Sequence, residues 1–541
     1  MLQHQIYAFL LSVSKIHALN LKMTFLLSRL VKKYPIATVV SFLLILSGCV
    51  DPGPEDTSKY APGTKEGYEL AKYHCSSCHS FVDASYLDSA TWHDKTLPPM
   101  GKRLGITYWN NNYVDTRDNA IGGLTFKQWQ QLVDYYLKSS PKKLTIPEPD
   151  VKPVVDMTVF EAKVPTYRTD SSSRTVMSSI DTITGNIYTS DFFSKKLMKW
   201  NSRLELVDSL RLNSPMVSAS FYTDKTGGNH GMFTSIGFLK PGNFQLGALV
   251  DISSNKSLLA HKDTIARQLA RPVYTSMADM NNDGLNDWVI SEFGHQVNGG
   301  LYIAEQKKNG TFEHKAVFEW PGATMTVVRD FNNDGWNDIM ALFAQDYESI
   351  KLYINNQDGS FTEKKIMSFL PVNGSSSFQL ADFNKDGLDD ILYTAGDNVD
   401  VSTTLKPYHG VYIFMNDGKN NYTQSFFYQI NGCTKAIAED FDKDGDLDIA
   451  TIAFYADFEN KPGEAFMYFE QTSPMKFKTY SPPVEKYGRW RTMEVADYDN
   501  DGDKDIILGN MTRDVYIEKK RPAIWDEHIP FILLENKTNK K

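Results

Sequence analysis

Five short acidic segments recur through the C-terminal half of the chain and constrain its fold more than any other feature. Each follows the pattern D-x-[DN]-x-D-G-x-x-D, and they begin at Asp279, Asp330, Asp382, Asp440 and Asp497. Their starts lie 51, 52, 58 and 57 residues apart. A period near 50 with several strands per unit indicates a β-propeller.

The apolar runs around each acidic segment predict where it lies in a blade. Phe378-Gln-Leu-Ala precedes one segment and Ile391-Leu-Tyr-Thr follows it, and such short runs separated by Gly, Asn and Asp are typical of strands and turns. We expect the two runs to form the two innermost strands of one blade. The 386 residues from 156 to 541 hold about seven units, which predicts seven blades, and the first two, within 156–268, lack the acidic segment. Asp181-Thr-Ile-Thr-Gly185 resembles a remnant of it.

The acidic segments have the composition of calcium loops. Side-chain oxygens at positions 1, 3 and 5 can converge, Gly at position 6 permits the required turn, position 7 offers a carbonyl, and Asp at position 9 closes the coordination sphere. Hard oxygen ligands without His or Cys favour Ca²⁺ over zinc or copper, whereas Mg²⁺ and metal-free acidic turns remain alternatives. The predicted ligands of up to five Ca²⁺ are Asp279, Asn281, Asp283, Asp287, Asp330, Asn332, Asp334, Asp338, Asp382, Asn384, Asp386, Asp390, Asp440, Asp442, Asp444, Asp448, Asp497, Asp499, Asp501 and Asp505.

These loops resemble those of the FG-GAP/VCBS family, the repeat of integrin-α-type propellers. The resemblance implies that calcium binds at one rim and is structural there, so we expect function at the opposite rim. Cations and aromatic side chains near that rim would bind an anionic or sugar ligand, or else only contact solvent. The residues of this rim are Arg271, His295, Tyr408, His409, Lys435, Trp490, Arg491 and the stretch 510–530.

The N-terminal segment has the features of a secretory leader. Lys32 and Lys33 precede an apolar run that ends in Leu46-Ser47-Gly48-Cys49. Cys after Leu-Ser-Gly resembles the bacterial lipoprotein box, which implies that Cys49 is lipidated and becomes the first mature residue; a short membrane anchor is the alternative. Translation starts at Met1 or Met23. The net charge of −9, which becomes −14 without residues 1–48, argues against nucleic-acid binding, and five Ca²⁺ would reduce it to −4.

Cys75-Ser-Ser-Cys78-His79 is a C-x-x-C-H motif. Two thiols one helical turn apart can add to the two vinyl groups of a haem, and the following His then lies beside the iron. The alternatives are a redox dithiol or half of a zinc site, but no second Cys pair exists and no βαβ pattern surrounds the motif. The motif therefore predicts one covalent haem c. The remaining Cys433 is predicted to be a small buried apolar residue.

About 80 residues around this motif resemble the class I cytochrome c family. A helical run from Lys65 to His74 leads into C-x-x-C-H, Leu97-Pro-Pro-Met100 forms a Pro-Met loop, and residues 124–137 carry an apolar helical stripe. The resemblance implies that His79 is the proximal ligand and Met100 the distal one, with a higher potential than a bis-His haem. His93 is the rival distal ligand, and His74 lies close to the motif.

The sequence thus predicts a multidomain protein with a small all-α cytochrome c domain followed by an all-β seven-bladed propeller. The expected parts are a signal peptide (1–48), a tether (49–63), the cytochrome domain (64–141), a Pro-rich linker (142–155) and the propeller (156–541). We expect an electron-transfer protein in the cell envelope of a Gram-negative bacterium, attached on the periplasmic or outer-membrane side by its lipid alone, with a redox partner protein or a small-molecule or glycan ligand. The alternatives are an oxidoreductase or carbohydrate-active propeller that passes electrons to the haem, and a calcium-dependent adhesion module.

Overall fold

The computed structural model describes residues 57–109, 112–115, 124–157, 159–253, 257, 262–397, 404–513 and 524–540. The chain divides into two compact units between Lys59 and Tyr60. Of the first unit only a 3₁₀ turn, Thr57–Lys59, is described, so the predicted signal peptide and Cys49 lie outside the described residues. Within the described ranges, no helix combines the length and apolar character of a membrane span.

Seven four-stranded antiparallel sheets form a β-propeller, which confirms the predicted number of blades. The blades, each from its innermost to its outermost strand, are β4 (Thr175–Asp181), β5 (Asn186–Asp191), β6 (Lys196–Trp200) and β7 (Leu206–Arg211); β8 (Met216–Thr223), β9 (Asn229–Ser235), β10 (Gly247–Ser253) and β11 (Lys262–Leu269); β12 (Pro272–Ala278), β13 (Asp287–His295), β14 (Asn298–Gln306) and β15 (Phe312–Phe318); β16 (Ala323–Arg329), β17 (Asp338–Phe343), β18 (Ser349–Asn355) and β19 (Phe361–Ser368); β20 (Ser375–Ala381), β21 (Asp390–Ala395), β22 (Gly410–Asn416) and β23 (Tyr422–Gln429); β24 (Cys433–Glu439), β25 (Asp448–Ala453), β26 (Phe466–Ser473) and β27 (Lys476–Tyr480); and β28 (Trp490–Ala496), β29 (Asp505–Asn510), β30 (Phe531–Asn536) and β3 (Phe160–Lys163).

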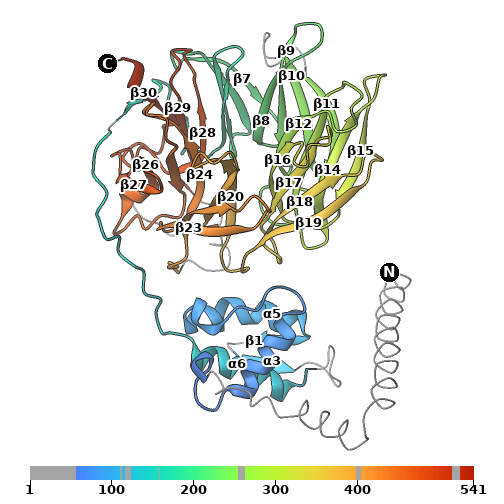
Figure 1. Cartoon of the computed structure of the whole chain (residues 1–541), viewed down its shortest axis with the longest axis vertical. Helices are drawn as coiled ribbons and strands as arrows, with labels where there is room; N and C mark the ends of the chain where they lie inside the picture. The colour runs from blue at the N-terminus through green and yellow to red at the C-terminus, as the bar shows by residue number, and fades with distance from the viewer. Residues whose placement is uncertain are drawn as a thin grey trace, which may run out of the picture. The chain divides into compact units, whose positions relative to one another are not determined.

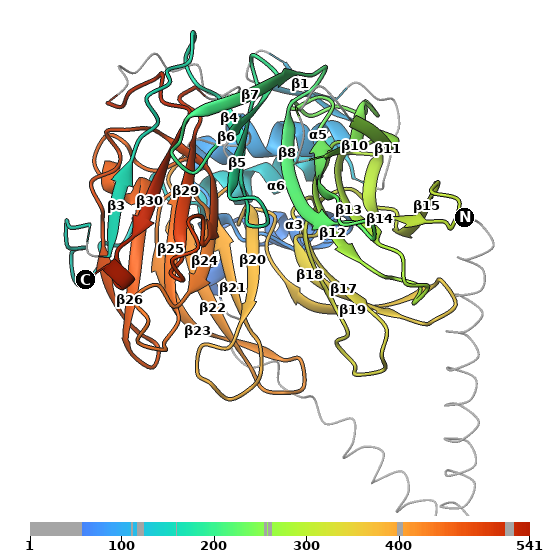
Figure 2. The same cartoon turned by 90° about the horizontal axis from the view of Figure 1, so that it is seen from above.

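The ring closes by pairing distant parts of the sequence. In the last blade β3, the first strand of the propeller, pairs with β30, the last, with Phe160 opposite Asn536. The innermost strands of successive blades contact one another around the whole circle, and β28 contacts β4. Figure 1 shows the blades, and Figure 2 shows the innermost strands β8, β12, β20 and β24 around the centre of the ring. Closure of the ring leaves the sheets with only their short outer edges exposed.

The burial of each strand follows its place in the blade. The second strands β17, β21, β25 and β29 are buried along their full length because both of their faces pack against neighbouring blades. The outermost strand β19 instead exposes most of its residues. The predicted strands around Phe378 and Ile391 are β20 and β21, the first and second strands of their blade, as expected.

Two helices form the core of the segment before the propeller. The helix α3 (Lys65–Cys75) packs on α6 (Phe126–Ser139), as the helical patterns predicted. A Cβ atom on Gly67 would lie 2.0 Å from the carbonyl oxygen of Gln131, so only glycine permits this close crossing. Trp129, Leu132 and Tyr135 of the predicted helical segment are buried.

The start of α6 is fixed by a capping box. Thr125 Oγ1 accepts the backbone N–H of Gln128 at 3.3 Å, and the Gln128 side chain accepts the backbone N–H of Thr125 at 2.9 Å. Each side chain thereby satisfies a backbone donor that the first helical turn leaves without a partner. The sequence Thr-x-x-Gln before an apolar stripe is typical of a capping box at the first turn of a helix.

The small segment is not purely helical, which corrects the predicted all-α architecture. A two-stranded ribbon, β1 (Ile106–Trp109) and β2 (Asn112–Asp115), follows the helix α5 (Leu97–Arg103). Tyr108 and Tyr113 are directly opposite each other, and their ring centroids lie 4.9 Å apart. Cross-strand aromatic pairs and β-branched residues favour a short ribbon over a helix here.

Candidate functional site

The C-x-x-C-H motif lies at the C-terminal end of α3. Cys75 is the last helical residue, and its carbonyl oxygen accepts the backbone N–H groups of Cys78 and His79, both at 3.3 Å. This turn therefore keeps the backbone positions of Cys75, Cys78 and His79 close together. Neither cysteine forms a disulfide: Cys75 is half-buried, with Sγ 3.8 Å from the hydroxyl of Tyr136, and Cys78 is exposed.

The orientation of His79 suits a metal ligand. The residue is 9% exposed, and its Nδ1 lies 2.8 Å from the carbonyl oxygen of Ser80. A carbonyl oxygen only accepts, so Nδ1 carries a proton, and in the neutral imidazole Nε2 then keeps its lone pair. A hydrogen bond at the second nitrogen is also what orients metal-binding imidazoles in general.

The predicted distal ligands lie in different surroundings. Met100 belongs to α5 and packs, partly buried, against the apolar core of the small segment. His93 lies in a polar group, with Nδ1 2.7 Å from Asp94 Oδ1 and its ring edge-on to Tyr108. His74 lies on α3, and burial lowers the pKa of its imidazole. The thioether of Met100 is thus the donor with the most apolar surroundings.

The residues that were expected to form a Pro-Met loop are helical, which corrects that prediction. Leu97 begins α5, and Pro98 and Pro99 occupy its first turn, where a missing backbone N–H removes no hydrogen bond. Gly101 lies one residue beyond Met100, and a Cβ there would meet the Trp129 ring at 2.9 Å. Gly101 therefore lets α5 approach Trp129 of α6 closely, next to the position of Met100.

Two thiols, one imidazole with a free Nε2 and one thioether are the groups that a c-type haem uses for attachment and axial ligation. The chemistry of this donor set fits that cofactor. It does not fit a structural zinc site, because zinc needs four ligands and the motif supplies three.

The acidic loops follow the innermost strands of five blades. In each loop the position-1 carboxylate accepts the backbone N–H of the position-6 glycine, as from Gly445 to Asp440 at 3.0 Å. All five of these glycines have φ between 77° and 91°, as predicted. The residue at position 4 is also left-handed in every loop, for example Lys443 with φ of 61°, which the pattern did not indicate.

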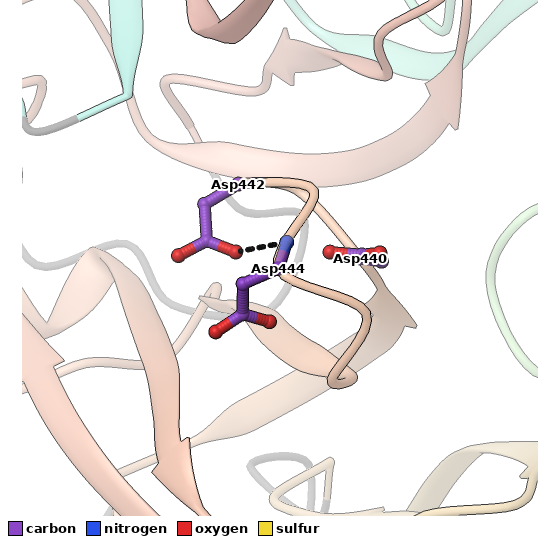
Figure 3. Close-up of side chains that lie close together, drawn as sticks. All are labelled: Asp440, Asp442 and Asp444. Atoms are coloured by element: carbon purple, nitrogen blue, oxygen red, sulfur yellow. Dashed lines mark hydrogen bonds between the residues drawn. The ribbon is translucent and has the colours of Figure 1, made fainter.

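Two of the loops bring three carboxylates together. Oxygens of Asp440, Asp442 and Asp444 all lie within 4.8 Å of one another, and those of Asp497, Asp499 and Asp501 do the same. Figure 3 shows the first group, in which Asp442 accepts the backbone N–H of Asp444 at 3.2 Å. Asp440 Oδ1 is buried and has no hydrogen-bond partner among the described residues. Three adjacent carboxylates with a buried free oxygen repel one another unless a cation lies between them.

The other three loops replace the middle Asp with Asn. The amide of Asn281 donates to Asp283 at 3.2 Å, and Asn332 and Asn384 donate in the same way to Asp334 and Asp386. This donor relieves part of the repulsion that the all-Asp loops retain. A cation is therefore needed most at the loops of Asp440 and Asp497.

The position-9 aspartates have a structural role of their own. Asp287, Asp338, Asp390, Asp448 and Asp505 are fully buried. Each accepts one backbone N–H from position 2 of its loop and another from the third strand of its blade, as Asp505 does from Tyr498 at 3.1 Å and Asn536 at 2.9 Å. Burial raises the pKa of Asp448 and of Asp505 to about 7. These hydrogen bonds give the five aspartates a structural role, and calcium ligation by the same residues stays a prediction.

Several residues predicted for the opposite rim are occupied by the fold itself. Arg271 is buried and donates to the carbonyl oxygens of Gly294 at 2.8 Å and Leu239 at 3.0 Å. Trp490 is fully buried, as is Cys433, whose thiol pKa is raised by burial. These side chains stabilise the ring and are not available to a ligand.

Among the remaining rim residues, some side chains are buried and others are partly exposed to solvent. His409 is 5% exposed, and burial holds the pKa of its imidazole well below its usual range. Arg491 pairs with Asp397 at 3.7 Å, whereas Lys435 forms no such ion pair with another described residue. Glu494, which sequence reasoning did not select, lies on β28 with its Oε1 3.1 Å from the backbone nitrogen of Ile180. Of the stretch 510–530, residues 514–523 lie outside the described ranges.

Comparison with known proteins identifies one repeat by sequence. Residues 330–393 match the FG-GAP-like repeat, and this range begins at the acidic loop of Asp330 and contains that of Asp382. No curated protein matches the chain.

Two solved structures share a distant similarity. A luciferin-regenerating enzyme is 8% identical, with a TM-score of 0.34 over 54% of this chain and 88% of that chain. BBS1N, solved in complex with ARL6DN, is 10% identical, with a TM-score of 0.42 over 71% of this chain and 99% of that chain. Scores this low say nothing of what this chain does. The FG-GAP repeat and the seven-bladed ring together indicate a binding or adhesion module.

Proposed function

We propose that this protein is an extracytoplasmic, lipid-anchored monohaem c-type cytochrome whose calcium-stabilised propeller binds a partner or ligand. The observation that supports it most is the arrangement at Cys75, Cys78 and His79, with two unpaired thiols and an imidazole whose Nε2 is free. A haem bound there would accept and donate single electrons.

The chain's own residues would then have distinct roles. Cys75 and Cys78 would attach the porphyrin, His79 Nε2 would ligate the iron, and the Ser80 carbonyl oxygen would keep that imidazole in the required tautomer. Met100, packed against an apolar core, would supply a thioether that raises the reduction potential. Cys49 would carry the lipid that holds the protein at a membrane of the cell envelope.

A second candidate function is a calcium-dependent adhesion or binding module in which the haem has no direct part. The FG-GAP-like match at residues 330–393 favours it. Retention of the protein on glycans or cell surfaces that requires calcium and persists after replacement of Cys75 and Cys78 would support it over electron transfer. A third, catalytic candidate would reveal itself by reduction of the haem with added sugars or alcohols.

The decisive experiment is expression of the full chain in a host that attaches c-type haem, followed by the pyridine haemochrome spectrum and the intact mass. We expect one covalent porphyrin per chain and its loss in the Cys75→Ser/Cys78→Ser variant. Cys433→Ser is the matched control and should retain the haem. A wild-type protein at the mass of polypeptide plus lipid alone would refute the haem assignment.

A further inference from the structure

Three polar side chains from different blades meet inside the ring. Lys435 lies on β24, Glu494 on the neighbouring β28, and Tyr274 on β12, three blades away from either. Glu494 interacts electrostatically with both Lys435 and Tyr274. Because the innermost strands surround the central channel of a propeller, groups from such distant blades can interact only across that channel.

The exposure of β24 agrees with this placement. Lys435 and Ile437 are half-buried, whereas Thr434 and Ala436 between and beside them are buried. Side chains alternate between the two faces of a strand, so Lys435 lies on the face of β24 that retains access to water. Glu494 and Tyr274 are half-buried as well, so all three groups keep some access to water.

Within the described part of the chain, the charge of Lys435 has no partner in direct contact. Among the described residues, its Nζ donates no hydrogen bond and forms no ion pair within 4.0 Å, although Glu494 is close enough to stabilise its charge. Glu494 accepts the backbone N–H of Ile180 at 3.1 Å, which holds its carboxylate in place. A water molecule or a hydroxyl group of a ligand can bridge two opposite charges that are not in direct contact, such as those of Lys435 and Glu494.

We propose that Lys435, Glu494 and Tyr274 form an axial binding site for a small, neutral, polyhydroxylated molecule such as a monosaccharide or a cyclic polyol. A hydroxyl group can accept from the Lys435 ammonium and donate to the Glu494 carboxylate at the same time. The Lys435–Glu494 pair has no net charge, so its attraction of an anion or a cation by one member is offset by repulsion from the other, and neither ion gains over a neutral ligand. Tyr274 adds a ring face and a further hydroxyl group.

The surroundings also favour a neutral ligand rich in hydroxyl groups. Burial lowers the pKa of Lys435 and raises the pKa of Glu494, because both charges are poorly solvated there. Hydroxyl groups of Ser276 and Thr326, on β12 and β16, hydrogen-bond to each other at 2.9 Å, and those of Ser178 and Thr492, on β4 and β28, do so at 2.6 Å. These four residues therefore add hydroxyl groups to the innermost strands and add no charge.

Titration calorimetry of the purified full chain with D-glucose, D-galactose and myo-inositol tests the proposal. We expect at least one to bind, and we expect Lys435→Met and Glu494→Gln each to weaken binding by tenfold or more, since each removes a hydrogen bond to a charged group. Lys365→Met, which removes an exposed lysine of β19, is the matched control and should leave the affinity unchanged.

Three results would overturn the proposal: no binding of the three compounds, binding that both variants retain, or binding of only the charged probes lactate or ethanolamine. Hydrogen exchange of the unmodified protein covers the case in which a variant does not fold. The bound sugar should then slow exchange in β24 and β28, and unchanged exchange in these strands would also refute the site. The inference does not rest on the haem, whose spectrum reports separately on each sample.

Discussion

The hydroxyl group of Tyr468 donates a 2.7 Å hydrogen bond to Asp448 Oδ2 in the interior of the sixth blade. Asp448 is fully buried and also accepts backbone N–H groups from Phe441 and Gln471. Loop, second strand and third strand are thereby joined through one carboxylate. A buried charge needs such donors, because it loses the solvation of water without them.

Tyr468→Phe should therefore destabilise the protein by about 1–3 kcal/mol, the range for a buried hydrogen bond to a charged group. Tyr353→Phe is the matched control, because its hydroxyl group makes only a 3.5 Å contact with Glu363. Urea denaturation of both variants measures the difference. Equal losses of stability in the two variants would mean that the hydrogen bond to Asp448 does not contribute more to stability than the long contact of Tyr353.

Calcium should stabilise the propeller, and its removal by a chelator should lower the melting temperature. At a free calcium concentration of 100 times Kd, one site contributes about 2.7 kcal/mol. Asp440→Ala should reduce this calcium-dependent shift, because it removes the carboxylate with the unpartnered buried oxygen. Calorimetry with and without calcium makes the measurement.

The control for this loop is Glu319→Ala, an exposed acid outside the acidic segments. It should leave the calcium-dependent shift intact. A melting temperature that does not respond to calcium in the unmodified protein would exclude a stabilising role for the metal.

Glu348 should make stability depend on pH. It is 4% exposed, and burial raises its pKa to about 7 despite hydrogen bonds from Ser375 and from the backbone of Gly374. Folding thus favours the protonated form, so its contribution is complete below pH 4.5 and is lost as pH rises through 7. Relative to Glu348→Gln, the wild type should lose up to about 3 kcal/mol over this range.

Denaturation curves at pH 4.5, 6 and 8 would reveal that loss. Comparison with Glu363→Gln, an exposed acid on β19, separates Glu348 from general charge effects. Parallel pH profiles for the wild type and Glu348→Gln would contradict the prediction.

If the chain binds the proposed haem, substitution can identify the distal ligand. If Met100 ligates the iron, Met100→Ala should lower the reduction potential and open the sixth position, whereas His93→Ala should leave the potential nearly unchanged. His79→Ala should abolish normal ligation in either case. Spectroscopic redox titration of the three variants distinguishes these outcomes, and a larger effect of His93→Ala would assign the ligand to that imidazole.

Gly67→Ala should disrupt the small segment. The added Cβ would lie 2.0 Å from a backbone oxygen of α6, so the helices must separate, at a cost of about 1–3 kcal/mol or more. Glu69→Ala, an exposed change on the same helix, should be nearly neutral. Helix content and thermal unfolding followed by circular dichroism would compare the two.

Several features of the fold depend on local sequence patterns and could be predicted from them. The spacing of the acidic segments predicted seven blades, the apolar runs around Asp382 predicted β20 and β21, and Thr125 with Gln128 encoded the start of α6. The same holds for the glycine at position 6 of each loop, because a left-handed backbone conformation there is a local requirement.

The contacts between distant residues depend on the three-dimensional fold and could not be predicted from local patterns. Pairing of β3 with β30 closes the ring across more than 370 residues, and ring closure alone brings Tyr274, Lys435 and Glu494 to one axis. It also placed Arg271 and Trp490 inside the fold, where the pattern had suggested an open rim. The local sequence does not indicate whether a neighbouring blade will cover a charged or aromatic side chain. Its burial depends on how whole sheets pack.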